Sequence, residues 1–229
     1  MKVLTKEIVE QNIRKLRENI EEIKARYGIE RDILIEAITK GVDAEKILWA
    51  YESGIKVMGE NRVQEALLKI PFLSLDIEWH LVGHLQTNKV KHALKIFKVI
   101  ESVDRVELIE AIDRRLTEPL EIFIEVNTSM EPQKTGCKME EVNRLVEEVL
   151  KRDKLMLTGF MTVGPYPVEE KRSREAFARL RDIKERIERE FGFSIKWLSM
   201  GMTEDYPYAI LEGANLLRIG RGIFGEVNR

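Results

Sequence analysis

Lys40 is the residue whose position most directly suggests chemistry. It closes the segment ILIEAITK at 33–40, in which apolar and small residues lead to a lysine followed by Gly41. A strand would end there, and a partly desolvated amine at that point is easier to hold neutral. Such an amine can form a Schiff base with a carbonyl compound. Lysine and arginine make up 38 of 229 residues, so position alone leaves a merely solvated lysine open.

Two glycine-containing loops near the carboxyl end of the chain could bind an anion. IKWLS at 195–199 leads into MGMTED at 200–205, and NLLRIG at 215–220 leads into RGIFG at 221–225. Glycines let backbone amides approach phosphate oxygens, and a helix start adds positive potential. A lysine together with a phosphate site predicts a ligand with an aldehyde at one end and a phosphate at the other. Pyridoxal 5′-phosphate (PLP) and a sugar phosphate both fit this description.

Two histidines raise the question of a metal ion. His80 lies within IEWHLVG at 77–83, and His84 follows that segment. Their spacing of four puts both side chains on one face only in a helix, and no acidic or cysteine partner stands nearby in the sequence. We therefore predict no metal site and a buried, hydrogen-bonded imidazole for His80.

These residues fall within a regular alternation of apolar segments and helical patterns. The expected strands lie at 33–40, 55–58, 77–83, 96–101, 120–126, 155–162, 195–199 and 215–220. The alternation predicts one (β/α)8 barrel of α/β class as a single domain over residues 1–229, with its site at the carboxyl ends of the strands. An extra amphipathic helix over 5–27, ended by Gly28, precedes the first strand.

Composition narrows the classes of function. The chain has 40 acidic and 38 basic residues, a net charge of −2, so nucleic acid is not an expected partner. A single cysteine, Cys137, excludes an internal disulfide and fits a reducing compartment. The longest uncharged run, at 155–168, is too short to span a bilayer, and the first residues lack the apolar core of a signal peptide. We expect a soluble, cytoplasmic monomer.

Seven motifs occur in order along the chain: ITK at 38–40, MGENRVQE at 58–65, WHLVGHLQTNKVK at 79–91, EVNTSMEPQKTG at 125–136, GFMTVGP at 159–165, LSMGMTEDYPYAI at 198–210 and LRIGRGIFG at 217–225. Together they resemble the YggS/PROSC family of pyridoxal phosphate homeostasis proteins. The resemblance covers nearly all the chain from the first strand onward. It implies a barrel of the alanine-racemase type and favours PLP over a sugar phosphate.

The resemblance also implies roles for individual residues. Lys40 is similar to the lysine that carries the cofactor as an internal aldimine. Arg218 matches the arginine that faces the pyridine nitrogen, and because a guanidinium does not release its proton, that nitrogen would stay unprotonated. Gly220 would offer its backbone N–H to the phosphate. Arg221 stands where the family more often has a small hydroxyl residue, so it could pair with the phosphate or point outward.

The remaining implied residues come from other strand ends. The strand-seven part of the phosphate site would consist of Ser199, Gly201 and Thr203. The residues that match the lining of the pocket are Asn61, His80 and Asn127, with Lys134 in a loop near its entrance.

The sequence is compatible with four functions. Racemases with this barrel add a second, all-β domain that supplies a catalytic tyrosine, and no second base is evident here beside Lys40. We therefore expect a protein that buffers PLP or delivers it to apo PLP-dependent enzymes, without strong catalytic activity. The alternatives are a weak PLP-dependent amino-acid racemase, a class I aldolase or related sugar-phosphate barrel, and an interaction barrel without a ligand.

Overall fold

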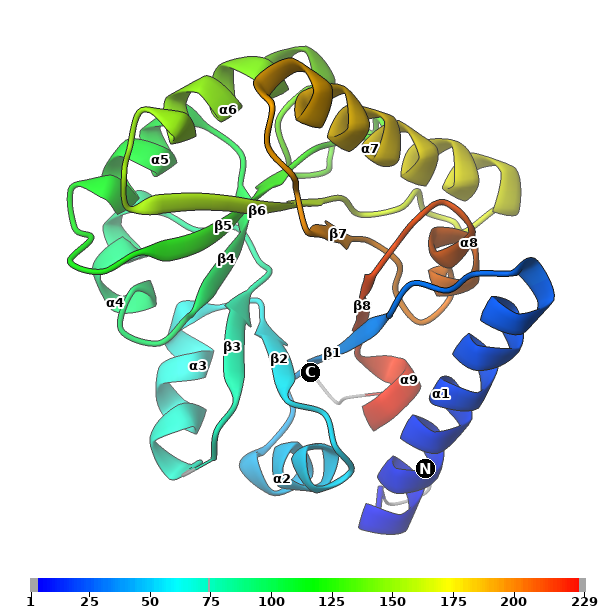
Figure 1. Cartoon of the computed structure of the whole chain (residues 1–229). Helices are drawn as coiled ribbons and strands as arrows, with labels where there is room; N and C mark the ends of the chain where they lie inside the picture. Colours follow the sequence, from blue (N-terminus) through cyan, green and yellow to red (C-terminus); the bar gives the residue numbers. More distant parts are fainter. Residues whose placement is uncertain (1–3, 74, 227–229) are drawn as a thin grey trace.

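Eight short strands follow one another in chain order and close into a parallel barrel in the computed structural model, which describes residues 4–73 and 75–226 (Figure 1). The strands are β1 (Leu34–Ile38), β2 (Val57–Glu60), β3 (Glu78–Leu81), β4 (Val99–Val103), β5 (Leu120–Glu125), β6 (Leu155–Met161), β7 (Trp197–Ser199) and β8 (Leu216–Ile219). Because β1 pairs with both β2 and β8, the sheet has no free edge. The predicted (β/α)8 barrel is confirmed.

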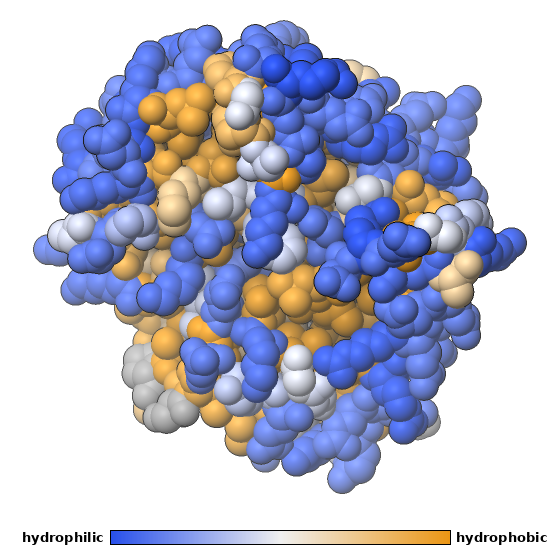
Figure 2. All heavy atoms as spheres, viewed as in Figure 1, coloured by the Kyte–Doolittle hydropathy of each residue, from blue (hydrophilic) through white to orange (hydrophobic). Residues whose placement is uncertain are grey.

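Helices separate the strands and form the outer layer. They are α1 (Lys6–Tyr27), α2 (Ala44–Glu52), α3 (Val63–Lys69), α4 (Val90–Ala93), α5 (Val106–Asp113), α6 (Val142–Leu150), α7 (Glu170–Phe191), α8 (Tyr206–Leu211) and α9 (Arg221–Phe224), with short 3₁₀ helices η1 (Ile70–Phe72), η2 (Thr87–Lys89) and η3 (Met139–Glu141). Within the described ranges, none of these helices has the length and apolarity required to cross a bilayer. Figure 2, in the same view, shows hydrophilic side chains over the helices and apolar side chains near the middle of the face.

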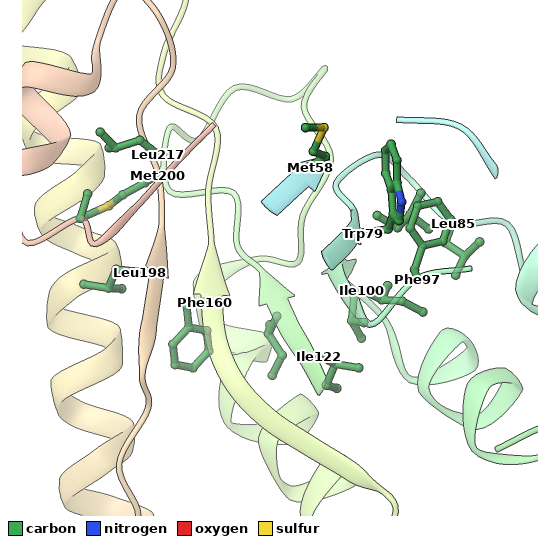
Figure 3. Close-up of a cluster of buried hydrophobic side chains, with 14 of the residues drawn as sticks. Met58, Trp79, Leu85, Phe97, Ile100, Ile122, Phe160, Leu198, Met200 and Leu217 are labelled. Carbon is green, nitrogen blue, oxygen red and sulfur yellow. The ribbon is translucent and has the colours of Figure 1, made fainter. Parts of the chain in front are cut away.

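Side chains alternate along each strand between the helical layer and the barrel interior. Ile122, Phe160 and Leu198, from three successive strands, belong to the main core that the strands share with the helices (Figure 3). A second, smaller cluster lies inside the barrel and consists of Val99, Phe123, Met161 and Leu216. The helical layer is therefore held by one apolar core and the barrel by another.

Charged side chains occupy the barrel interior next to this smaller cluster. Glu36, His80, Glu101 and Arg218 each come from the middle of a different strand, and each is at most 4% exposed. The interior of such a barrel is normally filled by branched apolar side chains. Buried ionisable groups are tolerated where they are paired and hydrogen-bonded or where they lose their charge.

The extra helix α1 lies along the outside of the barrel, beside α2, α8 and α9 (Figure 1). Its Asn12 side chain donates to the Ile223 carbonyl at 2.9 Å. Because α9 has only four residues, it covers little of the strands, and α1 supplies the missing apolar cover with its buried face. The helix ends at Gly28 in the left-handed conformation, with φ of 63°, as expected.

Candidate functional site

One cavity of about 510 Å³ opens at the carboxyl ends of the strands. Its lining residues are Ile38, Lys40, Asn61, Val82, Lys134, Met161, Val163, Gly164, Pro165, Tyr166, Val168, Met202, Thr203, Glu204, Asp205, Arg218, Gly220 and Arg221. They come from the ends of seven strands and the loops that follow. Lys40 and the two glycine-containing loops, far apart in the sequence, therefore share one cavity.

The backbone on either side of Lys40 is fixed by a polar network. Lys69 Nζ donates to the Thr39 carbonyl and to the buried Glu60 carboxylate, each at 2.7 Å. Thr39 Oγ1 donates to the same carboxylate at 2.6 Å, and the Gly41 N–H donates to Glu65. The side chain of Lys40 itself is exposed, so the desolvated amine expected from the sequence is wrong for this structure. The network fixes the backbone from which the Lys40 side chain extends, and the side chain itself is free to reach a ligand.

The loops after β7 and β8 are joined by a hydrogen bond. The Gly222 N–H donates to Thr203 Oγ1 at 3.0 Å. That bond uses the hydroxyl as an acceptor, so the Thr203 proton remains available to a ligand. Gly201 holds the turn between strand and loop with φ of +93°, and a Cβ there would lie 2.6 Å from Ala209 Cβ. No other residue fits this position without moving α8.

Arg221 lines the cavity, but its guanidinium is held by carboxylates at the surface. It donates to Glu204 at 2.6 Å and to Glu226 at 3.4 Å, and its side chain is 54% exposed. Of the two orientations left open by the sequence, the structure shows the one in which Arg221 is paired with protein carboxylates.

Arg218 forms part of the cavity floor. Its guanidinium donates to Ser199 Oγ and to the Thr162 carbonyl, both at 2.6 Å, and the residue is 4% exposed. Arginine carries a planar fork of donors, and these two fixed acceptors hold its plane where the residue lines the cavity.

Ser199, Gly201, His80 and Asn127 do not line the cavity. Ser199 lies behind Arg218 as its hydrogen-bond partner, and Gly201 lies in the turn described above. The Asn127 amide donates to the Glu131 carbonyl at 2.9 Å, within its own loop. His80 lies deeper in the barrel. The assignments of His80 and Asn127 to the pocket lining are therefore not what this structure shows.

Lys134 and Asp205 both lie at the cavity, and each makes at least one polar contact with the protein. Lys134 Nζ pairs with Glu131 at 2.5 Å and donates to the Gly164 carbonyl. Asp205 accepts from the Met202 N–H at 2.6 Å, while its second oxygen has no partner among the described residues. Burial raises the pKa of Asp205. The sequence did not identify Asp205 as a residue of the site, because an acidic residue that follows a strand is also typical of a helix N-cap.

His80 is surrounded by carboxylates from its own strand and from two others. Its Nδ1 lies 2.7 Å from Glu101 and 3.7 Å from Glu36, and its Nε2 lies 3.1 Å from Glu78. Burial opposes the imidazolium, but the hydrogen bonds to Glu101 and Glu78 outweigh it and raise the pKa of His80 to about 10. The sequence interpretation that no acidic partner stands near His80 was wrong, because Glu78 lies two residues before it in β3, while Glu36 and Glu101 approach it from β1 and β4.

Glu36, His80 and Glu101 place one ligand atom each within 4.8 Å of one another, as a metal site would. A protonated imidazole donates both protons and has no lone pair for a metal. Arg218 adds a second buried positive charge that interacts with both carboxylates. The cluster is thus already neutralised by protein cations, and His84 lies apart from it, near Asp104.

Glu125, at the end of β5, predicts a pH dependence of stability. Burial, partly offset by the Thr135 hydrogen bond, raises its pKa from 4.5 to about 7, and Asp104, Arg218 and Glu101 act on it electrostatically. The folded state therefore favours the protonated carboxyl. The contribution of Glu125 to the free energy of unfolding is fully present below about pH 4.5 and is lost as the pH rises past about 7. Glu125→Gln is expected to be more stable than wild type at about pH 8, by at most about 3 kcal/mol. Urea unfolding at several pH values measures the difference, which should shrink toward zero near pH 4.5.

Known proteins match the chain over most of its length. Residues 11–227 match the family described as "Alanine racemase, N-terminal domain". Proteins named pyridoxal phosphate homeostasis protein are 40% identical in Aquifex aeolicus, over 82% of this chain and 84% of that protein, and 34% identical in Schizosaccharomyces pombe, over 86% and 85%.

Solved structures match the fold. PipY of Synechococcus elongatus, with PLP bound, superposes with a TM-score of 0.84 at 28% identity, over 95% of this chain and 100% of that one. An alanine racemase of Clostridium difficile superposes with a TM-score of 0.75 at 16% identity, over 96% of this chain and 58% of the racemase. The second match shows the shared barrel alone.

Proposed function

The chain belongs to the family of pyridoxal phosphate homeostasis proteins, within the alanine racemase N-terminal-domain family, and we propose that it binds PLP at Lys40 and buffers or delivers it. The observation that carries this proposal is that Lys40, Arg218 and the loops after β7 and β8 line one cavity. The PLP-bound structure of PipY, a protein of the same barrel, supports the choice of ligand.

The residues present fit PLP at each end of the molecule. Bound PLP supplies an aldehyde that an amine can attack and a ring whose electron demand depends on the group at its nitrogen. Lys40 offers the amine, and Arg218, which can only donate, would leave the ring nitrogen unprotonated. The Thr203 hydroxyl and the Gly220 backbone N–H would hold the phosphate. The cavity volume lies within the range of about 300–1,000 Å³ common for small-molecule sites.

A carrier is favoured over an enzyme by the state of the other groups in the cavity. Racemisation needs a second base beside the lysine. Lys134 Nζ, the other amine of the cavity, is already bonded to Glu131 and to the Gly164 carbonyl. The relatives are also named for homeostasis of the cofactor. A weak amino-acid racemase remains the second candidate.

Transfer to an acceptor tests the proposed function. The PLP-loaded protein is expected to reactivate an apo PLP-dependent enzyme faster than an inert PLP trap releases the free cofactor. Racemisation and transamination of common amino acids should stay near the rate of free PLP. Turnover far above that rate, abolished by Lys40→Ala, would show that the protein is an enzyme.

Lys134→Ala is expected to slow this transfer several-fold, because an amine at the cavity edge can hold the aldehyde briefly as it leaves Lys40. The absorption of PLP bound at Lys40 should stay unchanged. Lys138→Ala is the matched control, since Lys138 is an exposed lysine of the same loop that does not line the cavity. Equal transfer by both variants would remove Lys134 from the route.

A further inference from the structure

A hydrogen-bonded chain of side chains crosses the barrel interior beneath the cavity. Arg218 Nη1 lies 2.6 Å from Ser199 Oγ, which lies 2.5 Å from Glu101 Oε2. Glu101 Oε1 lies 2.7 Å from His80 Nδ1, and His80 Nε2 lies 3.1 Å from Glu78 Oε1. Four of these residues are buried, whereas the Glu78 side chain is 55% exposed. The chain thus runs from the cavity floor to solvent at the start of β3.

Arg218 fixes the direction of the two hydrogen bonds that involve Ser199. A guanidinium can only donate, so Ser199 must accept from it. Ser199 has one proton, and the remaining bond requires that this proton be donated to Glu101. Oε2 of Glu101 is then an acceptor, and because the pKa of Glu101 is lowered and that of His80 is raised, Oε1 accepts the Nδ1 proton of His80 across the 2.7 Å contact. The Glu78 carboxylate accepts from Nε2, so His80 is doubly protonated.

The charges along the chain alternate in sign. Arg218 and His80 are cations, and Glu101 between them is an anion. Burial opposes ionisation of Glu101, but the hydrogen bond from His80 and the charge of Arg218 outweigh it and lower its pKa. Adjacent opposite charges in a dry interior strengthen such bonds. The bond that holds Arg218 therefore depends on charges two residues removed from the cavity.

Glu36 faces the same cluster but lies outside the chain. Both of its oxygens lack a hydrogen-bond partner among the described residues. Burial, reinforced by Glu101, raises its pKa well above the ordinary value. The raised pKa favours the protonated form of Glu36, which therefore provides a control with the same side chain beside the hydrogen-bonded chain.

We propose that Glu101 and His80 are positioning residues for Arg218, which they hold through Ser199 with its free donors toward the ring of PLP. This inference rests on the proposed function. A loss of charge at Glu101 would reverse or break the hydrogen bonds, because an amide presents a donor where the chain needs an acceptor. The orientation of Arg218, and with it the electronic state of the bound ring, would then change without any change in the residues that line the cavity.

Two isosteric substitutions test the proposal. Glu101→Gln is expected to weaken PLP binding by about tenfold, the effect of losing a charge-assisted hydrogen bond, and to shift the absorption band of bound PLP. Glu36→Gln replaces a neutral acid by a neutral amide and is expected to leave affinity and absorption as in wild type. Ser199→Ala keeps the Glu101–His80 pair while cutting the link to Arg218, so it should reproduce the shift if Glu101→Gln does not fold.

Nitrogen NMR of the cofactor-free protein tests the chain without PLP. The sequence has three histidines, and His84 and His92 are exposed, so the buried ring is readily assigned. His80 faces Glu36, Glu78, Glu101 and Arg218, and both ring nitrogens should stay protonated up to about pH 9. A ring that is neutral at pH 7, or a wild-type spectrum and affinity in both Glu101→Gln and Ser199→Ala, overturns the proposal. If wild type does not bind PLP, the proposed function fails and the positioning role with it, even where NMR shows the chain.

Discussion

Lys40→Ala is expected to abolish the covalent retention of PLP. After borohydride reduction, wild type should carry a phosphopyridoxyl group on the Lys40 peptide, and the variant should carry none above background. Lys40 is the lysine that follows β1 in the cavity, and its exposed amine can reach an aldehyde that the loops after β7 and β8 hold by its phosphate. Peptide mass spectrometry locates the label, and PLP titration should show a loss of affinity of more than about tenfold.

Lys40→Arg provides the matched control. It keeps the positive charge and length of the side chain, but a guanidinium does not lose its proton and is no nucleophile. Non-covalent binding should therefore survive better in Lys40→Arg than in Lys40→Ala, while both lack the label. A label found only on Lys134 or on scattered surface lysines of wild type would refute the assignment of Lys40.

The barrel could be predicted because its alternation of strands and helices is local, but two strand boundaries could not. The sequence predicted strands at 55–58 and 96–101, whereas β2 is Val57–Glu60 and β4 is Val99–Val103. Ile55 and Phe97 precede β2 and β4 in the sequence and are nevertheless buried. Apolar character therefore did not mark the residue at which strand pairing begins. Glu60 looked like a loop residue, yet it lies within β2, where Lys69 from the next helix neutralises it.

The cavity was more predictable than the interior beneath it. Motifs identify Lys40 and the phosphate loops because each is a continuous segment. Glu36 and Glu101 meet His80 only through the register of separate strands, which local spacing does not reveal. A signal was present: each of the strands LLRI, LIEAI and VIESV carries a charged residue among apolar ones, Arg218, Glu36 and Glu101 respectively. Charges at inward positions of several strands predict a shared cluster.

Arg218→Ala is expected to weaken both the fold and the binding of PLP. Its guanidinium is buried and donates to Ser199 and to the Thr162 carbonyl. Loss of one partner from a buried charge cluster costs about 3–5 kcal/mol, because the remaining groups keep their desolvation cost. Urea unfolding of the cofactor-free protein measures this change. PLP affinity should fall by more than about tenfold, with a shifted absorption band, because the ring nitrogen loses its donor.

Arg218→Lys separates these two effects. Lysine keeps the positive charge near Glu101 but presents a compact ammonium in place of a planar fork, so it cannot hold two acceptors and the ring at once. It should regain much of the stability lost in Arg218→Ala while the absorption of bound PLP stays different from wild type. If Arg218→Ala binds PLP with the affinity and spectrum of wild type, Arg218 does not contact the cofactor. A loss of stability alone would then identify it as the cation that neutralises the buried carboxylates.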